Sequence, residues 1–156
     1  FTNDIRFLDR KNWHITITFL GYQSDEAIGE ILNSLREISQ EAISPAIKFV
    51  NISYGPIGKS QRMIWLNGDP ATGKSLTSIK NLLEEKLIEN GARFKQEHRP
   101  FKLHITLARF HNLAVRPEID KKLRLQFQPQ SLDLMESHLS RQGANYELLQ
   151  SFPFKL

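Results

Sequence analysis

The sequence predicts an α+β fold of two lobes, each an antiparallel sheet with helices outside, that meet at a central cleft. The first observation is a repeat: His-Ile-Thr occurs at residues 14–16 and again at 104–106, each time within an apolar, strand-like run. The second is that a helical pattern follows each run, which indicates a degenerate duplication with pseudo-twofold symmetry. No low-complexity stretch or linker divides the halves, so residues 1–156 are predicted to form one domain of two intertwined lobes.

The first half of the chain is predicted to run strand, helix, strand, strand. Ser24 is suited to cap the helix, because its hydroxyl can accept from a backbone N–H of the first turn. Apolar residues then recur at helical spacing up to Ile38, and Pro45 ends that region. The Gly55-Pro56 turn closes the strand that follows. The predicted strands of this half are residues 13–21, 47–52 and 62–66.

The second half is predicted to run helix, strand, helix, strand, strand. Apolar residues between 76 and 87 share one helix face, and Asn90-Gly91 is a typical helix end. Pro117 is suited to the first turn of a short third helix through Leu123. The Gln142-Gly143 turn then joins a final strand pair. The predicted strands of this half are residues 103–109, 131–136 and 146–152.

Composition narrows the class of protein. Hydrophobic residues make up 40% of the chain, and no apolar run approaches the ~20 residues of a membrane span. The absence of cysteine excludes disulfides, thiolate zinc sites and a cysteine nucleophile, and it is compatible with the cytoplasm as the expected location. The net charge of +4 favours a polyanionic partner such as nucleic acid. The densest basic group, residues 93–102, is either a solvated connection or a phosphate-attracting rim beside His104.

The repeated tripeptide places polar groups in apolar strands. Because side chains alternate between the faces of a strand, His14 shares a face with Thr16, and His104 with Thr106. A buried histidine is costly without a partner or a task. Histidine has a reference pKa near ~6.5, so one ring can act as general base and the other as general acid on a phosphoester. The threonine hydroxyls can bind the phosphate oxygens. The alternative is two buried histidines tied to backbone carbonyls.

The two motifs and their flanks resemble those of the 2H phosphoesterases, and most closely the LigT-like bacterial RNA 2′,3′-cyclic phosphodiesterases, also called 2′-5′ RNA ligases. Residues 14–21 are similar to the first family motif and residues 104–109 to the second. The strand at 62–66, which contains Trp65, is similar to the strand between the motifs, and residues 132–154 resemble the C-terminal hairpin. The resemblance covers nearly the whole chain.

The resemblance implies hydrolysis of a 2′,3′-cyclic phosphate end of RNA to a 2′-phosphate, with no metal, cofactor or ATP, and reversible 2′-5′ joining of RNA ends. It makes His14 the proton donor to the leaving 3′ oxygen and His104 the proton acceptor that activates water. Thr16 and Thr106 correspond to the residues that hold the phosphate. Arg109 matches a family arginine that approaches the phosphate, although strict alternation places it on the opposite face from His104.

The resemblance also sets expectations about partners and about the chain's start. The implied partners are RNA with 2′,3′-cyclic phosphate ends, tRNA halves among them, or cyclic nucleotides. The protein is expected to be a monomer and to have no membrane partner. The family begins with an apolar strand ahead of the first motif, and here thirteen residues precede His14. We therefore expect a strand ahead of Phe1, with the aromatic residue that stacks on the base. A non-catalytic nucleotide- or RNA-end-binding module of the same fold is the alternative function.

A third interpretation comes from residues 68–75, Gly-Asp-Pro-Ala-Thr-Gly-Lys-Ser, which match the phosphate-binding loop pattern G-x-x-x-x-G-K-[ST]. Lys74 and Ser75 would then contact nucleotide phosphates and Mg²⁺. This interpretation leaves both His-Ile-Thr copies unexplained, and no later strand ends in a suitable aspartate. A polar surface loop leading into a helix accounts for the same residues.

The other histidines are expected in surface loops or turns without ligand-like spacing to carboxylates: His98, His111 and His138.

Overall fold

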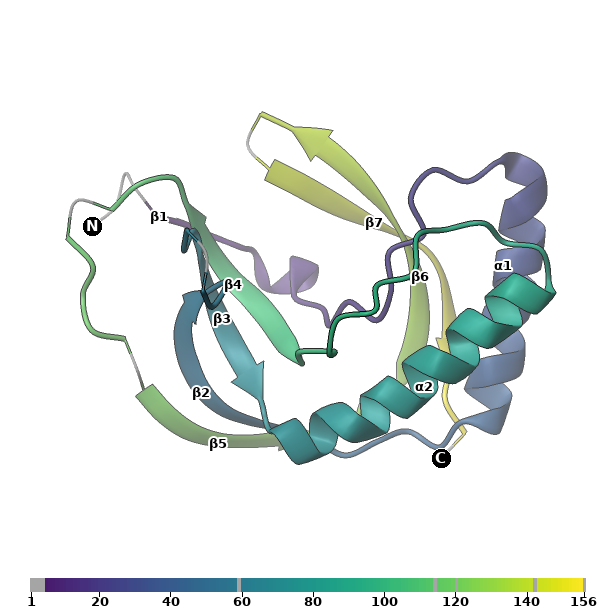
Figure 1. Ribbon diagram of the computed structural model, residues 1–156, viewed down its shortest axis with the longest axis horizontal. Coiled ribbons are helices and arrows are strands. Elements are labelled where there is room, and N and C mark those ends of the chain that lie inside the picture. The colour runs from purple at the N-terminus through teal and green to yellow at the C-terminus, as the bar shows by residue number, and fades with distance from the viewer. Residues whose placement is uncertain (1–4, 59, 114, 120, 142, 156) are drawn as a thin grey trace. The chain divides into compact units, whose positions relative to one another are not determined.

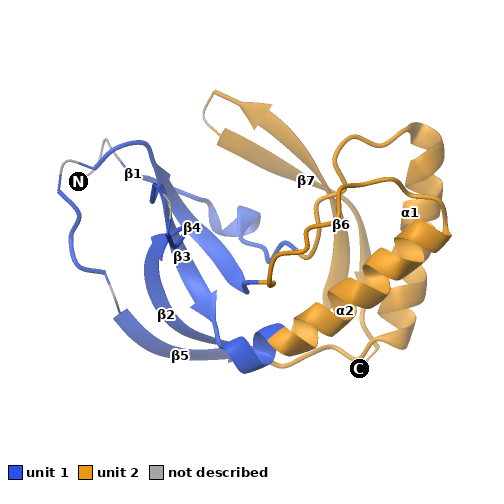
Figure 2. Ribbon diagram, in the orientation of Figure 1, with its two compact units in different colours: residues 1–16, 47–73, 102–127 blue, residues 17–46, 74–101, 128–156 orange. Residues whose placement is uncertain are grey.

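The computed structural model describes residues 5–58, 60–113, 115–119, 121–141 and 143–155. Their contacts divide the chain into two compact units, each assembled from three separate segments (Figure 2). Unit 1 comprises residues 1–16, 47–73 and 102–127, and unit 2 comprises residues 17–46, 74–101 and 128–156. Both units hold antiparallel strands, and the helices lie mainly in unit 2, so the predicted α+β class is confirmed. No helix in the described ranges is both long and apolar enough to cross a membrane.

Unit 1 is built on a five-stranded sheet in which every neighbouring pair is antiparallel. In spatial order its strands are β1 (Ile5–Phe7), β4 (His104–Phe110), β3 (Met63–Gly68), β2 (Ile47–Gly55) and β5 (Lys121–Phe127) (Figure 1). One face of this sheet carries a hydrophobic cluster centred on Ile64, Ala108 and Phe110. Burial of that face gives the sheet its stability and leaves the opposite face for polar side chains.

Unit 2 contains helix α1 (Asp25–Glu41), most of helix α2 (Pro70–Glu89) and a hairpin of β6 (Ser131–Ser140) and β7 (Gly143–Pro153). The Ser24 hydroxyl accepts a hydrogen bond from the Ala27 N–H at 3.2 Å, which confirms the predicted cap. The apolar stripe of α1 is buried, and this helix contacts both strands of the hairpin. The strand pair predicted for the C-terminal part is confirmed and is longer than expected.

The first His-Ile-Thr copy differs from its prediction. Residues 13–20 have no regular secondary structure, whereas a strand was expected over 13–21. A short 3₁₀ turn, Arg10–Asn12, precedes this segment, and the Asp9 carboxylate caps it by accepting from the Lys11 N–H. Both edges of β4 are already paired, with β1 on one side and β3 on the other, so that ladder has no place for another strand.

The third helix predicted from Pro117 to Leu123 is wrong, because Lys121–Phe127 forms strand β5 at the edge of the sheet. Leu123, Leu125 and Phe127 alternate along the strand, and the Phe127 ring stacks on Phe49 with 5.6 Å between ring centroids. This packing against β2 outweighs the helix-start signal of a single proline. The helix expected after the second His-Ile-Thr copy is therefore absent from the described residues, and the duplication is less complete than predicted.

Candidate active site

Both histidines of the repeated tripeptide are held by the same local contact. Nδ1 of His14 lies 2.7 Å from the carbonyl oxygen of Asn12, and Nδ1 of His104 lies 2.8 Å from that of Lys102. In each case the acceptor is the backbone two residues earlier. Because a carbonyl oxygen only accepts, Nδ1 carries the proton of the neutral ring, and Nε2 is its unprotonated nitrogen.

The His104 ring packs against an aromatic partner within the sheet. Its centroid lies 4.0 Å from that of the Trp65 ring system, and the ring planes are inclined by 29°. Trp65 in turn lies over Gly55, where an added Cβ would come 2.4 Å from the indole. The indole Nε1 is buried without a hydrogen-bond partner among the described residues, so packing alone holds this ring. A glycine at 55 is therefore needed for the stack that fixes the plane of His104.

The electrostatic surroundings of His104 favour its neutral form. Burial lowers the pKa of His104 below its ordinary value of 6.5, and the positive charge of His14 lowers this pKa further, against the opposing effect of the Lys102 carbonyl. Charge coupling requires the two rings to lie near each other, and both belong to unit 1. The two predicted histidines thus lie in one unit, and the surroundings of His104 favour its neutral form.

The strand register shows which residues share the sheet face of His104. His104 lies opposite Asn67, and Thr106 lies opposite Trp65. Because alternate residues of β3 point the same way, both motif residues of β4 lie on one face, opposite the hydrophobic cluster. The hydroxyls of Thr16 and Thr106 form no hydrogen bond with any described residue. Both are half-buried and can donate to a ligand.

A β-bulge places Arg109 on this same face. Thr106 pairs with Trp65 and Ala108 with Ile64, so Leu107 is an extra residue in β4. Beyond the bulge, Arg109 pairs with Met63, which lies two residues from Trp65 and on its face of β3. The opposite-face position expected from strict alternation is therefore wrong, and Arg109 joins His104 and Thr106.

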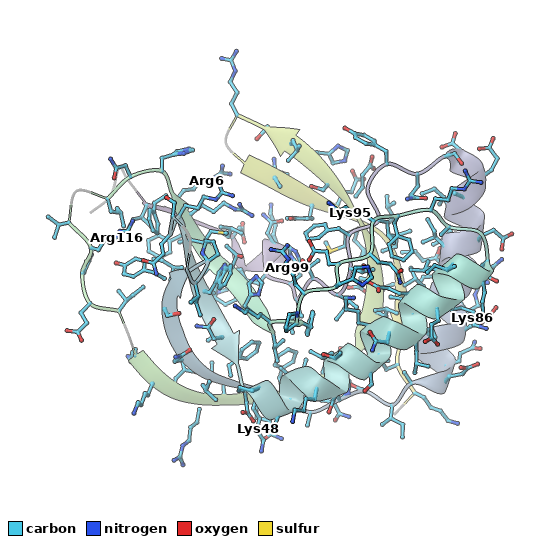
Figure 3. All side chains as sticks on the ribbon, viewed as in Figure 1. Arg6, Lys48, Lys86, Lys95, Arg99 and Arg116 are labelled. Atoms are coloured by element: carbon cyan, nitrogen blue, oxygen red, sulfur yellow. The ribbon has the colours of Figure 1, made fainter. Side chains whose placement is uncertain are left out.

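A second arginine on this face was not predicted. Arg6 of β1 lies directly opposite Arg109 of β4, and the exposed Arg6 is at the edge of the sheet (Figure 3). Like charges directly opposite each other destabilise a strand pair, and neither guanidinium forms an ion pair within the described ranges. The pair is suited to an anionic ligand. A three-residue strand is too short to be recognised from alternation, which is why Arg6 gave no signal in the sequence.

The end of the first motif is anchored by a buried polar network within unit 2. The Thr18 hydroxyl donates to the Glu84 carboxylate at 2.8 Å, and the Lys80 ammonium lies 2.7 Å from the same carboxylate. The side chains of Lys80 and Glu84 are only 11% and 6% exposed. This pair was also missed, because lysine and glutamate four residues apart on a helix usually indicate a solvated face.

The phosphate-loop pattern at residues 68–75 does not form such a loop. Gly68 belongs to strand β3 and helix α2 begins at Pro70, although a loop was expected through Gly73. The Gly73 N–H donates to the Asp69 carbonyl at 3.0 Å, so this N–H already has a backbone partner. At Gly68 a Cβ would come 2.2 Å from the Leu103 side chain, which gives this glycine a packing reason. The local structure therefore does not support the P-loop interpretation.

The remaining histidines divide into two groups. His98 and His111 are exposed and lie outside helices and strands, as predicted. The surface-loop position expected for His138 is wrong, since this residue lies in β6 with Nε2 at 3.4 Å from Glu136 and 3.3 Å from Glu147. The three side chains have ligand atoms within 4.8 Å of one another and are all exposed. A hydrogen bond between His138 and Glu147 on the hairpin surface accounts for this cluster.

Comparison with known proteins links these features to a family. The model of the family described as LigT like Phosphoesterase matches residues 2–65, which include the first motif. The RNA 2′,3′-cyclic phosphodiesterase of Methanocaldococcus jannaschii is 25% identical over 155 residues, covering 95% of this chain and 84% of the relative. The protein of the same name from Aeropyrum pernix is 28% identical over 152 residues, covering 93% and 84%. Over residues 2–65 the chain is similar to the LigT-like phosphoesterases, and over nearly its whole length it is similar to RNA 2′,3′-cyclic phosphodiesterases.

Solved structures agree on the fold of this phosphoesterase. TT0787 of Thermus thermophilus matches with a TM-score of 0.77 at 22% identity, covering 98% of this chain and 84% of that one. Escherichia coli LigT in complex with 3′-AMP matches with a TM-score of 0.69 at 24% identity, covering 97% and 82%. At these identities the likeness establishes the LigT-like architecture, while the chemistry must be argued from the residues.

Proposed function

We propose that this phosphoesterase hydrolyses 2′,3′-cyclic phosphate ends of RNA to 2′-phosphates, with His104 as general base and His14 as general acid. The observation that carries the proposal is the pair of imidazoles in one unit, each with Nδ1 bound to the carbonyl two residues earlier and with coupled charges. Support for the substrate class comes from the relatives named RNA 2′,3′-cyclic phosphodiesterase.

The proposed reaction needs one water and two proton transfers. Nε2 of neutral His104 takes a proton from water as the water oxygen bonds to phosphorus. The bond between phosphorus and the 3′ oxygen breaks, and Nε2–H of protonated His14 gives its proton to that oxygen. The cycle ends when His104 releases its proton and His14 regains one from solvent. The lowered pKa of His104 supports its assignment as the acceptor.

The proposed phosphate ligands are Thr16, Thr106 and Arg109. Thr106 and Arg109 share the sheet face of His104, and Thr16 follows His14 by two residues. Two hydroxyl donors and one guanidinium can stabilise the charge that builds on the nonbridging oxygens as water attacks. The same centre also accounts for 2′-5′ joining, because a 5′-hydroxyl can take the place of water and microscopic reversibility allows both directions.

The test is turnover of an oligonucleotide with a 2′,3′-cyclic phosphate end in the presence of EDTA. We expect an oligonucleotide with a 2′-phosphate, formed at a rate that EDTA does not change. His111→Ala is the matched control, since this exposed loop histidine lies outside the proposed site. Tight binding without product would identify a binding module, and loss of activity with EDTA would contradict the metal-free mechanism.

A further inference from the structure

A row of polar residues extends from His104 across the sheet. His104 of β4 lies opposite Asn67 of β3, Asn67 opposite Asn51 of β2, and Asn51 opposite Lys122 of β5. Residues that pair in register lie on the same face, so the row continues the face of the proposed site. Adjacent strands are spaced by about 4.8 Å, which puts the two asparagines one and two spacings from His104.

The two asparagines are unusual residues for these positions. Asparagine is depleted in strands, and here two of them lie directly opposite each other on β2 and β3, which are interior strands of the sheet. Residues whose intrinsic preference disagrees with the element that they occupy are most often found at functional sites. This placement therefore calls for an explanation beyond the stability of the sheet.

The hydrogen bonds of these amides leave one donor and one acceptor available. Nδ2 of Asn67 donates to Oδ1 of Asn51 and to the hydroxyl of Ser53, both at 2.9 Å, and so uses both of its hydrogens. Oδ1 of Asn67 and Nδ2 of Asn51 form no hydrogen bond with any described residue. Both residues are half-buried, and neither of these atoms is a buried polar atom without a partner. The internal hydrogen bond fixes the two amides while both groups stay open to solvent.

We propose that Asn51 and Asn67 form the subsite that reads the base of the terminal nucleotide, an assignment that rests on the proposed function. Nucleobases carry neighbouring donors and acceptors on one edge, and asparagine amides are suited to recognise such edges. The base is joined to the same ribose as the cyclic phosphate. A subsite one to two strand spacings from His104 therefore lies within the reach of one nucleoside.

One substitution exchanges the free donor for an acceptor and keeps the internal hydrogen bond. Asn51→Asp retains the oxygen that accepts from Asn67, while a second carboxylate oxygen replaces the free amide. The subsite then presents two acceptors, which suits the adjacent N1–H and N2–H donors of guanine. We expect kcat/KM for guanosine 2′,3′-cyclic phosphate to rise by about tenfold or more relative to the adenosine, cytidine and uridine substrates.

The measurement compares the four 2′,3′-cyclic nucleotides as ratios of kcat/KM. The new negative charge repels every cyclic phosphate alike, so it cancels in these ratios. Asn67→Ala should bring the four values closer together, because it removes the free acceptor and the contact that orients Asn51. Ser53→Thr is the matched control, since it keeps the hydroxyl that accepts from Asn67 and changes neither free group, and its ratios should equal those of the wild type.

The outcomes separate this inference from the proposed function. Wild-type turnover with unchanged ratios in both asparagine variants would overturn base reading and leave the hydrolase intact. If the wild type turns over none of the four substrates, the proposed function fails. The inference is then tested by equilibrium binding of the four nucleoside 2′-phosphates, where unchanged relative affinities in Asn51→Asp would overturn it.

Discussion

The two His-Ile-Thr copies share a sequence and a hydrogen bond but not a secondary structure. The second copy begins β4 between β1 and β3, whereas the first follows a 3₁₀ turn and has no strand assignment. Yet both histidines bind the carbonyl two residues earlier through Nδ1. The comparison teaches that a local contact, to the backbone two residues before each histidine, orients the ring. Pairing of the segment within a sheet is not required for this orientation.

The copies also differ in what supports them. His104 is stacked on a buried tryptophan and has a lowered pKa. The first copy is instead continued by Thr18, which is bound to the buried Lys80–Glu84 pair of α2. Burial of the His104 ring favours its neutral form. The two copies of one motif thus have different surroundings, which residues distant in the sequence provide.

The largest effect is expected from removing either histidine. His14→Ala and His104→Ala should each lower kcat by about 10²–10⁴-fold, the contribution typical of general acid–base catalysis. The double variant should lose little more than either single variant, because the two groups act in one step. Initial rates on the cyclic-phosphate oligonucleotide measure this, with His111→Ala as the control. An additive loss in the double variant would show that the two copies act independently.

The next effect is on the anchor of the first copy. Glu84→Ala leaves the buried Lys80 ammonium without its carboxylate and Thr18 without its acceptor, so we expect a loss of about 3–5 kcal/mol in the free energy of unfolding. Urea denaturation measures the change. The exposed neighbour Glu85→Ala is the matched control and should change stability little. Equal losses in both variants would contradict a specific role for the buried pair.

A smaller effect is expected from crowding the support of the second copy. Gly55→Ala puts a methyl group against the Trp65 indole, so we expect a loss of about 1–3 kcal/mol in the free energy of unfolding, with lower kcat. Gly29→Ala on α1 meets no atom within 4 Å and should instead stabilise by about 0.4–1 kcal/mol. Thermal or urea unfolding of the Gly55→Ala and Gly29→Ala variants measures both changes in the free energy of unfolding. A neutral Gly55→Ala would show that the stack tolerates displacement.

The smallest effect is a shift in pH dependence. The base must be neutral to act, so the acid limb of kcat/KM should have its midpoint below pH 6.5 in the wild type. Trp65→Leu removes the stacked ring and exposes His104, which raises the pKa of His104 toward its ordinary value. The acid limb should therefore move to higher pH. Measurement of kcat/KM across the acid range tests this, and an unmoved limb would contradict the link between Trp65 and His104.

The sequence predicted those features that depend on near neighbours. The Ser24 cap, the helix ending before Asn90-Gly91 and the strand at His104 follow from patterns within a few residues. The His-x-Thr spacing likewise singled out the two histidines that share one backbone contact, while their catalytic roles stay a prediction. The sequence of β5 contains alternating leucines, which indicate a strand, but the nearby Pro117 favoured the prediction of a helix. In the structure this segment is a strand because it packs on β2, where Phe127 stacks on Phe49.

The missed features depend on contacts between distant segments. The bulge at Leu107 arises from the register of β4 against β3, so alternation within β4 alone placed Arg109 on the wrong face. The hydrogen bond between Thr18 and Glu84 joins residues 66 positions apart. The stack of Trp65 on His104 and the pairing of Arg6 with Arg109 also require the assembled sheet. None of these contacts has a local signature.

The central claim is that His14 acts as the acid and His104 as the base. The most direct measurement compares each alanine variant on a 2′,3′-cyclic nucleotide and on a 3′-deoxynucleoside 2′-(4-nitrophenyl) phosphate, which keeps the 2′ oxygen on phosphorus and whose nitrophenolate leaves without a proton. We predict that His14→Ala loses far less activity on the aryl ester than on the cyclic substrate, while His104→Ala loses the same on both. Equal losses in the two variants on both substrates, or the reverse pattern, would contradict the account.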